Sequence, residues 1–394
     1  MEKRKIPAVR FKGFEDDWEQ CKLSDVLDDM YNGQTPSRNK SEYWNGNIKW
    51  LSSGELNRGT VYDSIEMITE DGQKSANLRI VPKGTFIMAI TGLEAAGTRG
   101  NCALLGFDTT LNQSCMALFP KKDLLTSDFL FQWYRKVGEE YGLNYTQGTK
   151  QQSYNAELIK ILPISLPLVT EQKKIASYLS NIDHLITLHQ RKLEKLQLVK
   201  KSMLEKMFPK NGSKIPEIRF EGFADDWEQR KLGEVTQKFK SGKSLKADKI
   251  SESGAYPVYG GNGLRGYTST YNHEGEFALI GRQGALCGNM NYFIGKAYFT
   301  EHAVAVEADE NNNTRFMYYM LDTMNLGQYS DQSAQPGLAV NKLIKLENMF
   351  PKKEEQIKIE NYFQSIDHLI TLHQRKLEKM KSFKKSLLEK LFVQ

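Results

Sequence analysis

The chain of 394 residues contains no apolar run of the roughly 18–20 residues that a bilayer-spanning helix needs. Its first residues, MEKRKIPAVRFKGF, lack the apolar stretch of a secretory signal. Cysteine is scarce: Cys21, Cys102, Cys115 and Cys287 form no CxxC pair and no zinc-finger spacing with histidine. We therefore expect a cytoplasmic protein with unpaired cysteines, no metal site and no membrane partner.

Signatures of catalysis are also missing. The sequence has no HExxH, no GxSxG and no Asn/Asp-Pro-Pro-aromatic tetrapeptide of the kind that amino-methyltransferases carry. Residues 261–266 (GNGLRG) match GxGxxG, but no helical apolar period follows them, so we expect a glycine-rich turn and not a dinucleotide site. Residues 241–244 (SGKS) resemble the end of a phosphate-binding loop, yet Gln237 stands where its first glycine belongs. We expect neither catalytic residues nor a bound cofactor in this chain.

The charge balance is only mildly basic. The chain carries 54 Lys and Arg against 48 Asp and Glu, a net charge of +6. This balance permits a polyanionic partner such as nucleic acid without proving one. Residues 173–206 hold a local excess of basic residues, which a solvated helix face explains equally well.

Two segments of the chain occur twice. The sequence IDHLITLHQRKLEK fills residues 182–195 and again residues 366–379, 184 positions later. Upstream, RFKGFEDDWEQCKL (10–23) is echoed by RFEGFADDWEQRKL (219–232), 209 positions later. Internal repetition outweighs other signals when a fold is interpreted. The order is a–X–b–a′–Y–b′, in which the middles X (24–165) and Y (233–350) do not repeat.

The b segments predict two long helices that pair with each other. Apolar residues recur at alternating spacings of four and three, with no Pro or Gly between them, which is typical of a coiled-coil seam. We expect antiparallel helices of about 35 residues, ~50 Å long, with His189 and His373 as polar seam residues and Lys200 and Lys384 reaching out of the seam. The expected seam comprises Ile175, Leu179, Ile182, Ile186, Leu193 and Leu196 in the first helix, and Ile359, Phe363, Ile366, Ile370, Leu377 and Met380 in the second.

The middles predict mixed domains. Short β-prone runs lie at 48–51, 85–90 and 115–119 in X and at 277–280 and 303–306 in Y, and each middle holds one expected helix, at 129–141 and 315–324. The expected fold class is α+β, with two globular mixed domains separated by two long antiparallel coiled-coil helices and an internal pseudo-two-fold repeat. The expected boundaries are 1–170 and 208–353 for the domains, and 171–207 and 354–394 for the helices.

Polar loops at matching places in X and Y suit nucleic acid. Arg reads guanine and Gln or Asn reads adenine through paired hydrogen bonds, while Lys and Ser hold phosphates. For any one of these residues an exposed polar loop is an open alternative, and the signal is the recurrence of two loop types in both middles. The candidate DNA-binding residues are Arg99, Asn101, Lys150, Gln151, Gln152 and Ser153 in X, and Arg265, Tyr267, Arg282, Gln283, Gln332 and Gln335 in Y.

Together these features resemble the specificity (S) subunit of a Type I restriction–modification system, over essentially the whole chain. The resemblance rests on the two RFxGFxDDWEQxKL segments, on LPLVTEQKKIA (166–176) and MFPKKEEQIKIE (349–360), and on the repeated IDHLITLHQRKLEK. YPVYGGNGLRGYTSTYNHEG (256–275) and LIGRQGALCG (279–288) look like a target-recognition domain of that family. X departs from this pattern, with IKWLSSGELNRG (48–59) in place of the YGGNG stretch, which suggests two domains of different subtype.

The resemblance implies a mechanism. X and Y would each read one half of a split, asymmetric DNA sequence, and the helices would act as a ruler for the unread spacer. The helices would also dock two modification subunits, which bind S-adenosylmethionine and methylate adenine at N6 after flipping it out. Restriction subunits, which use ATP and Mg, would join this core, and the chain itself would be non-catalytic. A coiled-coil DNA-binding scaffold without strict sequence specificity, and a stand-alone enzyme, are the alternatives.

Overall fold

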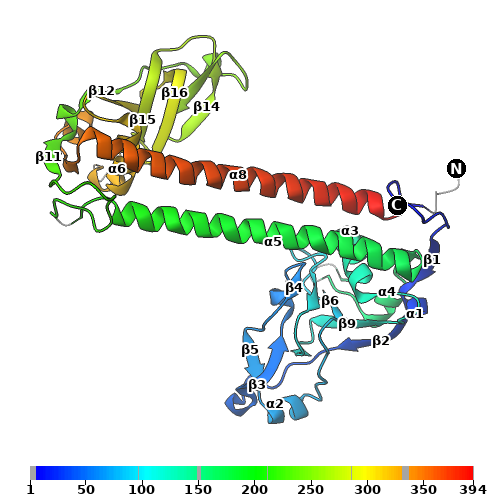
Figure 1. Ribbon diagram of the computed structural model, residues 1–394. Helices are drawn as coiled ribbons and strands as arrows, with labels where there is room; N and C mark the ends of the chain where they lie inside the picture. The colour runs from blue at the N-terminus through cyan, green and yellow to red at the C-terminus, as the bar shows by residue number, and fades with distance from the viewer. Residues whose placement is uncertain are drawn as a thin grey trace. The chain divides into compact units, whose positions relative to one another are not determined.

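The computed structural model describes residues 6–95, 97–148, 152–210, 212–284, 286–330 and 337–393. The chain forms two compact units: unit 1 comprises residues 1–189 and 376–394, and unit 2 comprises residues 190–375. The two long helices expected from the heptad spacing are present as α5 (Val169–Lys206) and α8 (Lys353–Leu391), and each contributes one part to each unit (Figure 1). Within the described ranges, no helix is long and apolar enough to cross a membrane. The domain boundaries expected at residues 170 and 353 lie where α5 and α8 begin, and they stay a prediction.

Unit 1 is a mixed α+β unit. A five-stranded sheet in the order β2-β9-β6-β7-β4 carries the helix α3 (Ser127–Asn144) against β6 and β7, and a smaller sheet has the order β5-β3-β8. The strand β6 is buried on both faces, which explains its uninterrupted apolar sequence FIMA. The remaining elements are β1 (Glu19–Lys22), α1 (Leu23–Val26), β2 (Leu27–Asn32), β3 (Trp44–Leu51), β4 (Thr60–Val61), β5 (Glu66–Ile68), α2 (Glu70–Ser75), β6 (Phe86–Ala89), β7 (Cys102–Leu105), β8 (Thr110–Leu111), β9 (Cys115–Pro120), α4 (Ala156–Lys160) and β10 (Pro163–Leu166).

Unit 2 repeats this plan with one larger sheet. Its six strands lie in the order β12-β17-β15-β16-β13-β14, and the helix α6 (Thr314–Thr323) packs against β15, β16 and β17. The strands and helices expected from the sequence in both middles are therefore confirmed. The elements are β11 (Glu228–Lys231), β12 (Thr236–Ser241), β13 (Tyr256–Gly260), β14 (Gly263–Thr268), β15 (His273–Gly281), β16 (Met290–Phe299), β17 (Ala303–Ala308), α7 (Val340–Leu343) and β18 (Glu347–Phe350).

The repeated segment at 10–23 and 219–232 fastens each unit to its long helix. In unit 1 its strand β1 pairs with β10, and Arg10 donates two hydrogen bonds of 2.8 Å to the carboxylate of Glu171 on α5. In unit 2 β11 pairs with β18, and Arg219 donates two bonds of 2.7 Å to Glu355 on α8. A bidentate Arg–carboxylate pair fixes orientation as well as distance. This role explains why the segment is duplicated while the sheets are not.

The long helices also contribute to the core of each unit. In unit 1 the ring of Phe392, just after α8, lies 6.2 Å from Trp18 and 5.3 Å from Phe129. In unit 2 the ring of Phe208, just after α5, lies 6.3 Å from Trp227 and 5.5 Å from Phe316. The start of one long helix and the end of the other thus share one hydrophobic core in each unit. Within each unit the two helix segments run antiparallel, as expected.

The expected seam is apolar and largely buried. Seven of its residues are buried, namely Ile175, Leu179, Ile182, Ile359, Phe363, Ile366 and Leu377. The other five, Ile186, Leu193, Leu196, Ile370 and Met380, are half-buried. His373 is buried and His189 is half-buried, which places both within the packed helix surface. The heptad spacing therefore identified the packed face correctly.

The expectation that Lys384 reaches out to solvent is wrong. Lys384 is only 5% exposed and forms an ion pair with Asp183 on α5. Asp183 also accepts a bond of 2.5 Å from Arg135 on α3, a helix of the non-repeated middle. The lysine stays inside because a carboxylate is within reach there. Its counterpart Lys200 also stays beside an acid, 2.6 Å from Asp367.

Candidate nucleic-acid interface

The two candidate loops of unit 1 lie against each other. Tyr154 donates its backbone N–H to Ile90 at 2.8 Å, and Leu93 donates its own to Gln152 at 3.1 Å. Gln152 in turn donates its N–H to the carboxylate of Glu94 at 3.2 Å. These bonds join the loop that follows β6 to the loop that precedes α4. Candidates Gln152 and Ser153 are thereby held beside the loop that follows β6, with Oε1 of Gln152 buried, whereas Lys150 and Gln151 lie outside the described residues.

The guanidinium group of Arg99 is used within its own loop. Its Nε donates to the carbonyl of Leu93 at 2.9 Å and its Nη2 to the carbonyl of Glu94 at 2.6 Å. Arg58 lies beside it and was missed from the sequence: it donates to the Arg99 carbonyl at 2.5 Å and to Oδ1 of Asn101 at 3.2 Å. Arg58 has a left-handed backbone, with φ of 58°. A non-glycine residue with such a backbone is uncommon and often lies at a functional site. The sequence alone does not reveal this conformation, so Arg58 could be found only from the structure.

Unit 2 joins its loops in the same way. Leu338 donates its N–H to the carbonyl of Arg282 at 2.9 Å, as Tyr154 does to Ile90 in unit 1. The side chain of Arg282 returns to the carbonyl of Leu338 at 3.1 Å and to Oγ of Ser241 at 3.4 Å. Like Arg99, Arg282 therefore holds its loop in place. Candidates Gln332 and Gln335 lie outside the described residues.

A cavity of about 450 Å³ opens beside this loop of unit 2. Its lining includes two sequence-predicted residues, Arg265 and Gln283, with exposed side chains, and His302 and Asn262 are added by the fold. Gly263, with φ of 91°, follows the turn between β13 and β14, so the GxGxxG match is a hairpin turn as expected. Tyr267 is half-buried in β14 and does not line the cavity. Arg and Gln side chains beside a groove can each form paired bonds to a base edge.

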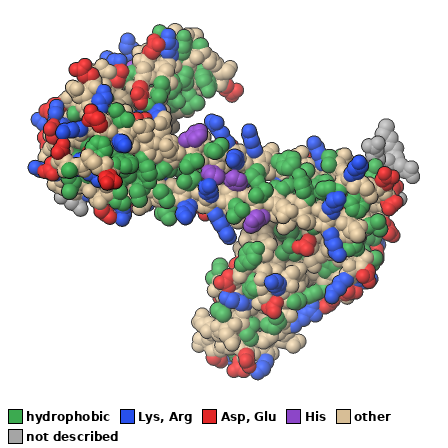
Figure 2. All heavy atoms as spheres, viewed as in Figure 1, with side chains coloured by type: hydrophobic (Ala, Val, Ile, Leu, Met, Phe, Trp, Pro, Cys, Tyr) green, Lys and Arg blue, Asp and Glu red, His purple; other side chains and the backbone are tan. Residues whose placement is uncertain are grey.

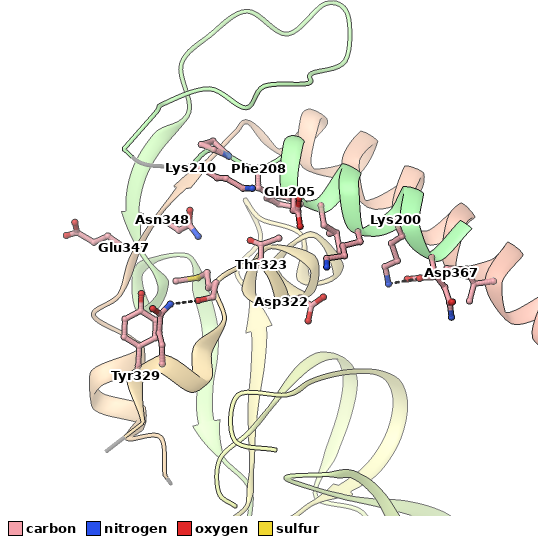
Figure 3. Close-up of a pocket in the computed structure, with 17 residues that line it drawn as sticks. Lys200, Glu205, Phe208, Lys210, Asp322, Thr323, Tyr329, Glu347, Asn348 and Asp367 are labelled. Atoms are coloured by element: carbon pink, nitrogen blue, oxygen red, sulfur yellow. Dashed lines mark hydrogen bonds and ion pairs between the residues drawn. The ribbon is translucent and has the colours of Figure 1, made fainter. Parts of the chain in front are cut away.

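A larger cavity of about 1030 Å³ lies at the end of α5 in unit 2 (Figure 3). Its walls come from α5, α6, β18 and α8, and the ion pair between Lys200 and Asp367, 2.6 Å apart, is part of its lining. The lining mixes Lys200, Lys201 and Lys210 with Glu205, Asp322, Glu347 and Asp367. Four carboxylates beside three lysines repel a polyanion. This cavity is therefore the weaker candidate for DNA.

The repeated helices present a second kind of surface. Leu185 and Leu188 on α5 are 47% and 46% exposed, and their repeats Leu369 and Leu372 on α8 are 40% and 38% exposed. Residues three apart lie on one face of a helix, so each unit displays one leucine pair. Along the exposed surface of the long helices, Lys, Arg and His side chains are interspersed with hydrophobic ones (Figure 2). Exposed apolar pairs of this kind are candidate contact surfaces for a protein partner.

Comparisons with known proteins agree with the repeat. The family model of the Type I restriction modification DNA specificity domain matches residues 15–198 and 224–382. The Type I restriction enzyme EcoprrI specificity subunit of Escherichia coli is 32% identical over 370 residues, covering 91% of this chain and 89% of that protein. The MjaVIII specificity subunit of Methanocaldococcus jannaschii is 24% identical over 414 residues, covering 96% and 92%. A crystal structure of the Type I restriction–modification S subunit from M. genitalium has the same fold, with a TM-score of 0.72 at 19% identity over 98% of this chain and 99% of that one.

Proposed function

The chain belongs to the family of Type I restriction–modification DNA specificity subunits, and from this premise we propose that units 1 and 2 each read one half of a split DNA sequence. One observation carries the proposal. Both units join the same two loops by the same backbone bond, Tyr154 to Ile90 and Leu338 to Arg282, but display different side chains there. A shared frame with different polar groups suits two readers of different sequence. A DNA-binding scaffold without sequence specificity is not favoured, because the relatives are specificity subunits.

The candidate side chains differ between the two units, which predicts a DNA target with two different half-sites. Unit 1 offers Asn101, whose Oδ1 also accepts a bond from Arg58, and Gln152, whose Oε1 is buried, whereas unit 2 presents the exposed side chains of Arg265 and Gln283 at its cavity. Arg pairs best with guanine, and Asn or Gln with adenine. Arg99 and Arg282 act indirectly in this proposal, because their guanidinium groups bind backbone carbonyls and so hold the loops that carry the base-contacting side chains.

The repeated leucine pairs suit docking of two modification subunits, one on each unit. These partners bring S-adenosylmethionine and transfer the methyl group to adenine, and restriction subunits add ATP- and Mg-dependent cleavage. This chain contributes recognition and positioning and no chemistry. Over the described ranges, no group of three or more His, Cys, Asp or Glu could hold a metal ion.

Exchange of residues 24–165 for the corresponding segment of another family member tests the two-reader proposal. Mapping methylated adenines by sequencing should show one changed half-site and one unchanged half-site. The matched change in unit 2, Arg265→Ala with Gln283→Ala, should relax the other half-site only. A change in both half-sites, or in neither, from the segment exchange would refute separate readers.

Docking is tested by charge placed on the leucine pairs. Leu185→Glu with Leu188→Glu should remove one modification subunit from the complex, and native mass spectrometry should report the loss. Leu198→Glu is the control, since Leu198 is 67% exposed on the same helix and is not repeated in α8. Full assembly with both leucines replaced would exclude this surface.

Helix length is proposed to set the unread spacer between the half-sites. Insertion of one helical turn near Leu196, within α5, should lengthen the spacer and preserve both half-sites. The same methylation mapping reports both quantities. An unchanged spacer would show that the helices are not a ruler.

A further inference from the structure

One loop of unit 2 carries a row of exposed lysines. Lys240 ends β12 with Ser241, and Lys243, Lys246 and Lys249 follow at intervals of three. All four side chains are exposed, and within the described part of the chain none has an ion pair or a side-chain hydrogen bond. The neighbouring Lys238 differs, because it pairs with Glu307 at 2.7 Å. Residues 238–249 contain five lysines and one acid, Asp248.

The loop has a defined place on the sheet. Gly242 donates its N–H to Ala303 at 3.0 Å, and Lys243 donates its N–H to Phe299 at 3.0 Å. A Cβ on Gly242 would stand 2.0 Å from the carbonyl oxygen of Phe299, so only glycine fits this close approach. The hydroxyl of Tyr298 donates to the carbonyl of Ser244 at 3.1 Å. These bonds hold the lysine row as a built surface of the unit.

The lysine row adjoins the cavity that holds Arg265 and Gln283. Arg282 donates its N–H to His302, which lines the cavity, and its side chain reaches Ser241 at the start of the loop. Phosphates flank the base edges of a duplex throughout, with one charge for each ~3.4 Å of helix axis on either strand. A surface that pairs base-reading side chains with a neighbouring basic row therefore fits double-stranded DNA better than it fits a protein.

The positive charge of the lysine row affects the pKa of a neighbouring histidine, His273. Burial and the charges of Lys238, Lys240 and Lys243 lower the pKa of His273 to about 4, against the opposing effect of Glu307. His273 is therefore neutral at pH 7. Glu307 is paired with Lys238 and so does not offset the four lysines of the row. Glu301, which accepts a bond from Ser244, and Asp248 offset part of their charge and leave a net excess of positive charge.

Unit 1 has the same loop with fewer charges. Gly33 makes the same close approach, with a Cβ placed 2.0 Å from the carbonyl oxygen of Leu111. The positions that match Lys240, Lys243, Lys246 and Lys249, 209 residues earlier, are Tyr31, Gln34, Ser37 and Lys40, so one of the four is basic. The basic residues that remain are occupied: Arg38 pairs with Glu66 and lies 3.8 Å from the ring of Trp44, and Lys40 donates to the hydroxyl of Tyr43 at 3.0 Å.

We propose that Lys240, Lys243, Lys246 and Lys249 form a phosphate-binding row by which unit 2 holds the DNA backbone, and that unit 1 has no equivalent among its described residues. The two units thus contribute unequally to the salt-dependent part of DNA binding. The inference rests on the proposed function, because it assumes that unit 2 faces DNA. Phosphate contacts position a protein but carry no base preference, so the row adds affinity and leaves the sequence read unchanged.

The test uses the complete complex with its modification subunits. Affinity for a duplex that contains the target is measured over a range of KCl concentrations, for the native complex and for the variant with all four lysines changed to Gln. Each phosphate contact contributes about 0.9 to the slope of log K against log salt. The slope should therefore fall by up to about 3.6, while methylation mapping shows the same target.

Two matched variants separate this row from general charge. Lys243→Gln with Lys246→Gln should lower the slope, whereas Lys122→Gln with Lys345→Gln, which removes two exposed lysines elsewhere, should leave it unchanged. Lys243→Arg with Lys246→Arg should keep the native slope. An unchanged slope in the four-lysine variant would overturn the phosphate-binding row, and so would a changed target sequence in that variant. If the native complex bound target and non-target duplexes equally well, the proposed function would be refuted instead.

Discussion

Replacing Asp183 by Asn should destabilise unit 1 far more than replacing its partner Lys384 by Met. Asp183 accepts bonds from Arg135, at 2.5 Å, and from Lys384. The side chains of Asp183, Arg135 and Lys384 are 30%, 17% and 6% exposed. The change to Asn leaves two cations side by side with no carboxylate between them. Removing one partner of a buried ion pair costs about 3–5 kcal/mol, and partial exposure of Asp183 points to the lower end.

The change Lys384→Met leaves the pair of Asp183 and Arg135 intact. Burial, and then the charge of Arg135, lower the pKa of Lys384 from 10.5 to about 8. The unfolded chain then binds more protons than the folded one between pH 8 and 10.5, so stability should rise with pH across that window. The charged lysine opposes folding at pH 7 by at most roughly 3 kcal/mol, at 1.36 kcal/mol per pKa unit. We therefore expect Lys384→Met to be at least as stable as the native protein at pH 7, and to lose this rise.

Unit 2 should show the opposite order, although its helices carry the same pair. Lys200 lies 2.6 Å from Asp367, but α6 places Asp322 nearby in place of an arginine. Burial raises the pKa of Asp322, as does the charge of Asp367, while the charge of Lys200 lowers it. Lys200→Met leaves two carboxylates together, whereas Asp367→Asn leaves Lys200 with Asp322. The side chains of Lys200 and Asp367 are 20% and 35% exposed, so the cost of Lys200→Met should be only about 1 kcal/mol.

Hydrogen exchange at increasing urea concentrations, resolved by peptide, measures the stability of each unit separately. Tryptophan fluorescence adds a signal dominated by unit 1, which contains Trp18, Trp44, Trp50 and Trp133, while unit 2 contains Trp227. If Lys384→Met destabilises unit 1 as much as Asp183→Asn, then Arg135 does not suffice to hold Asp183, and the expected order is refuted. If unit 2 follows the same order as unit 1, the repeated helices set the charge balance and α3 and α6 do not.

Three further outcomes follow from single contacts. Gly242→Ala, whose Cβ would stand 2.0 Å from the carbonyl oxygen of Phe299, should disrupt the loop after β12, and faster exchange of the amides at 242–249 would report it. Glu171→Gln leaves Arg10 without its carboxylate partner, at a side chain that is only 1% exposed, and should lower the free energy of unfolding of unit 1 by about 3 kcal/mol. An unchanged midpoint in denaturant unfolding would contradict a stabilising role of the Arg10–Glu171 pair. Phe208→Ala removes a ring from the core of unit 2 and should cost about 3–5 kcal/mol there, with no effect on exchange in unit 1.

Patterns that are local in sequence predicted much of the fold. The alternating spacing of Ile175, Leu179 and Ile182 identified the packed face of α5, because side chains at that spacing share one side of a helix. The same holds for α8, for the strands of both middles and for the turn before Gly263. The candidate site was only partly accessible in this way. Its polar segments could be found by composition, but the inward direction of Arg99 and Arg282 depends on carbonyl groups supplied by the folded loops.

The sequence by itself determined that this protein has two long paired helices, two repeated segments and two unlike middles. Repeats and heptads can be recognised from residues that are close together in the sequence. Only the tertiary structure decided which charges are used and which are available. Arg10 meets Glu171 across 161 positions, and Lys384 meets Asp183 across 201. Identical helix residues acquire an arginine neighbour in unit 1 and a carboxylate neighbour in unit 2. The lysine row of unit 2 adjoins the cavity of Arg265 through Arg282, which bonds to both His302 and Ser241. Electrostatic free energy depends on distances between atoms, and those distances exist only once the chain has folded.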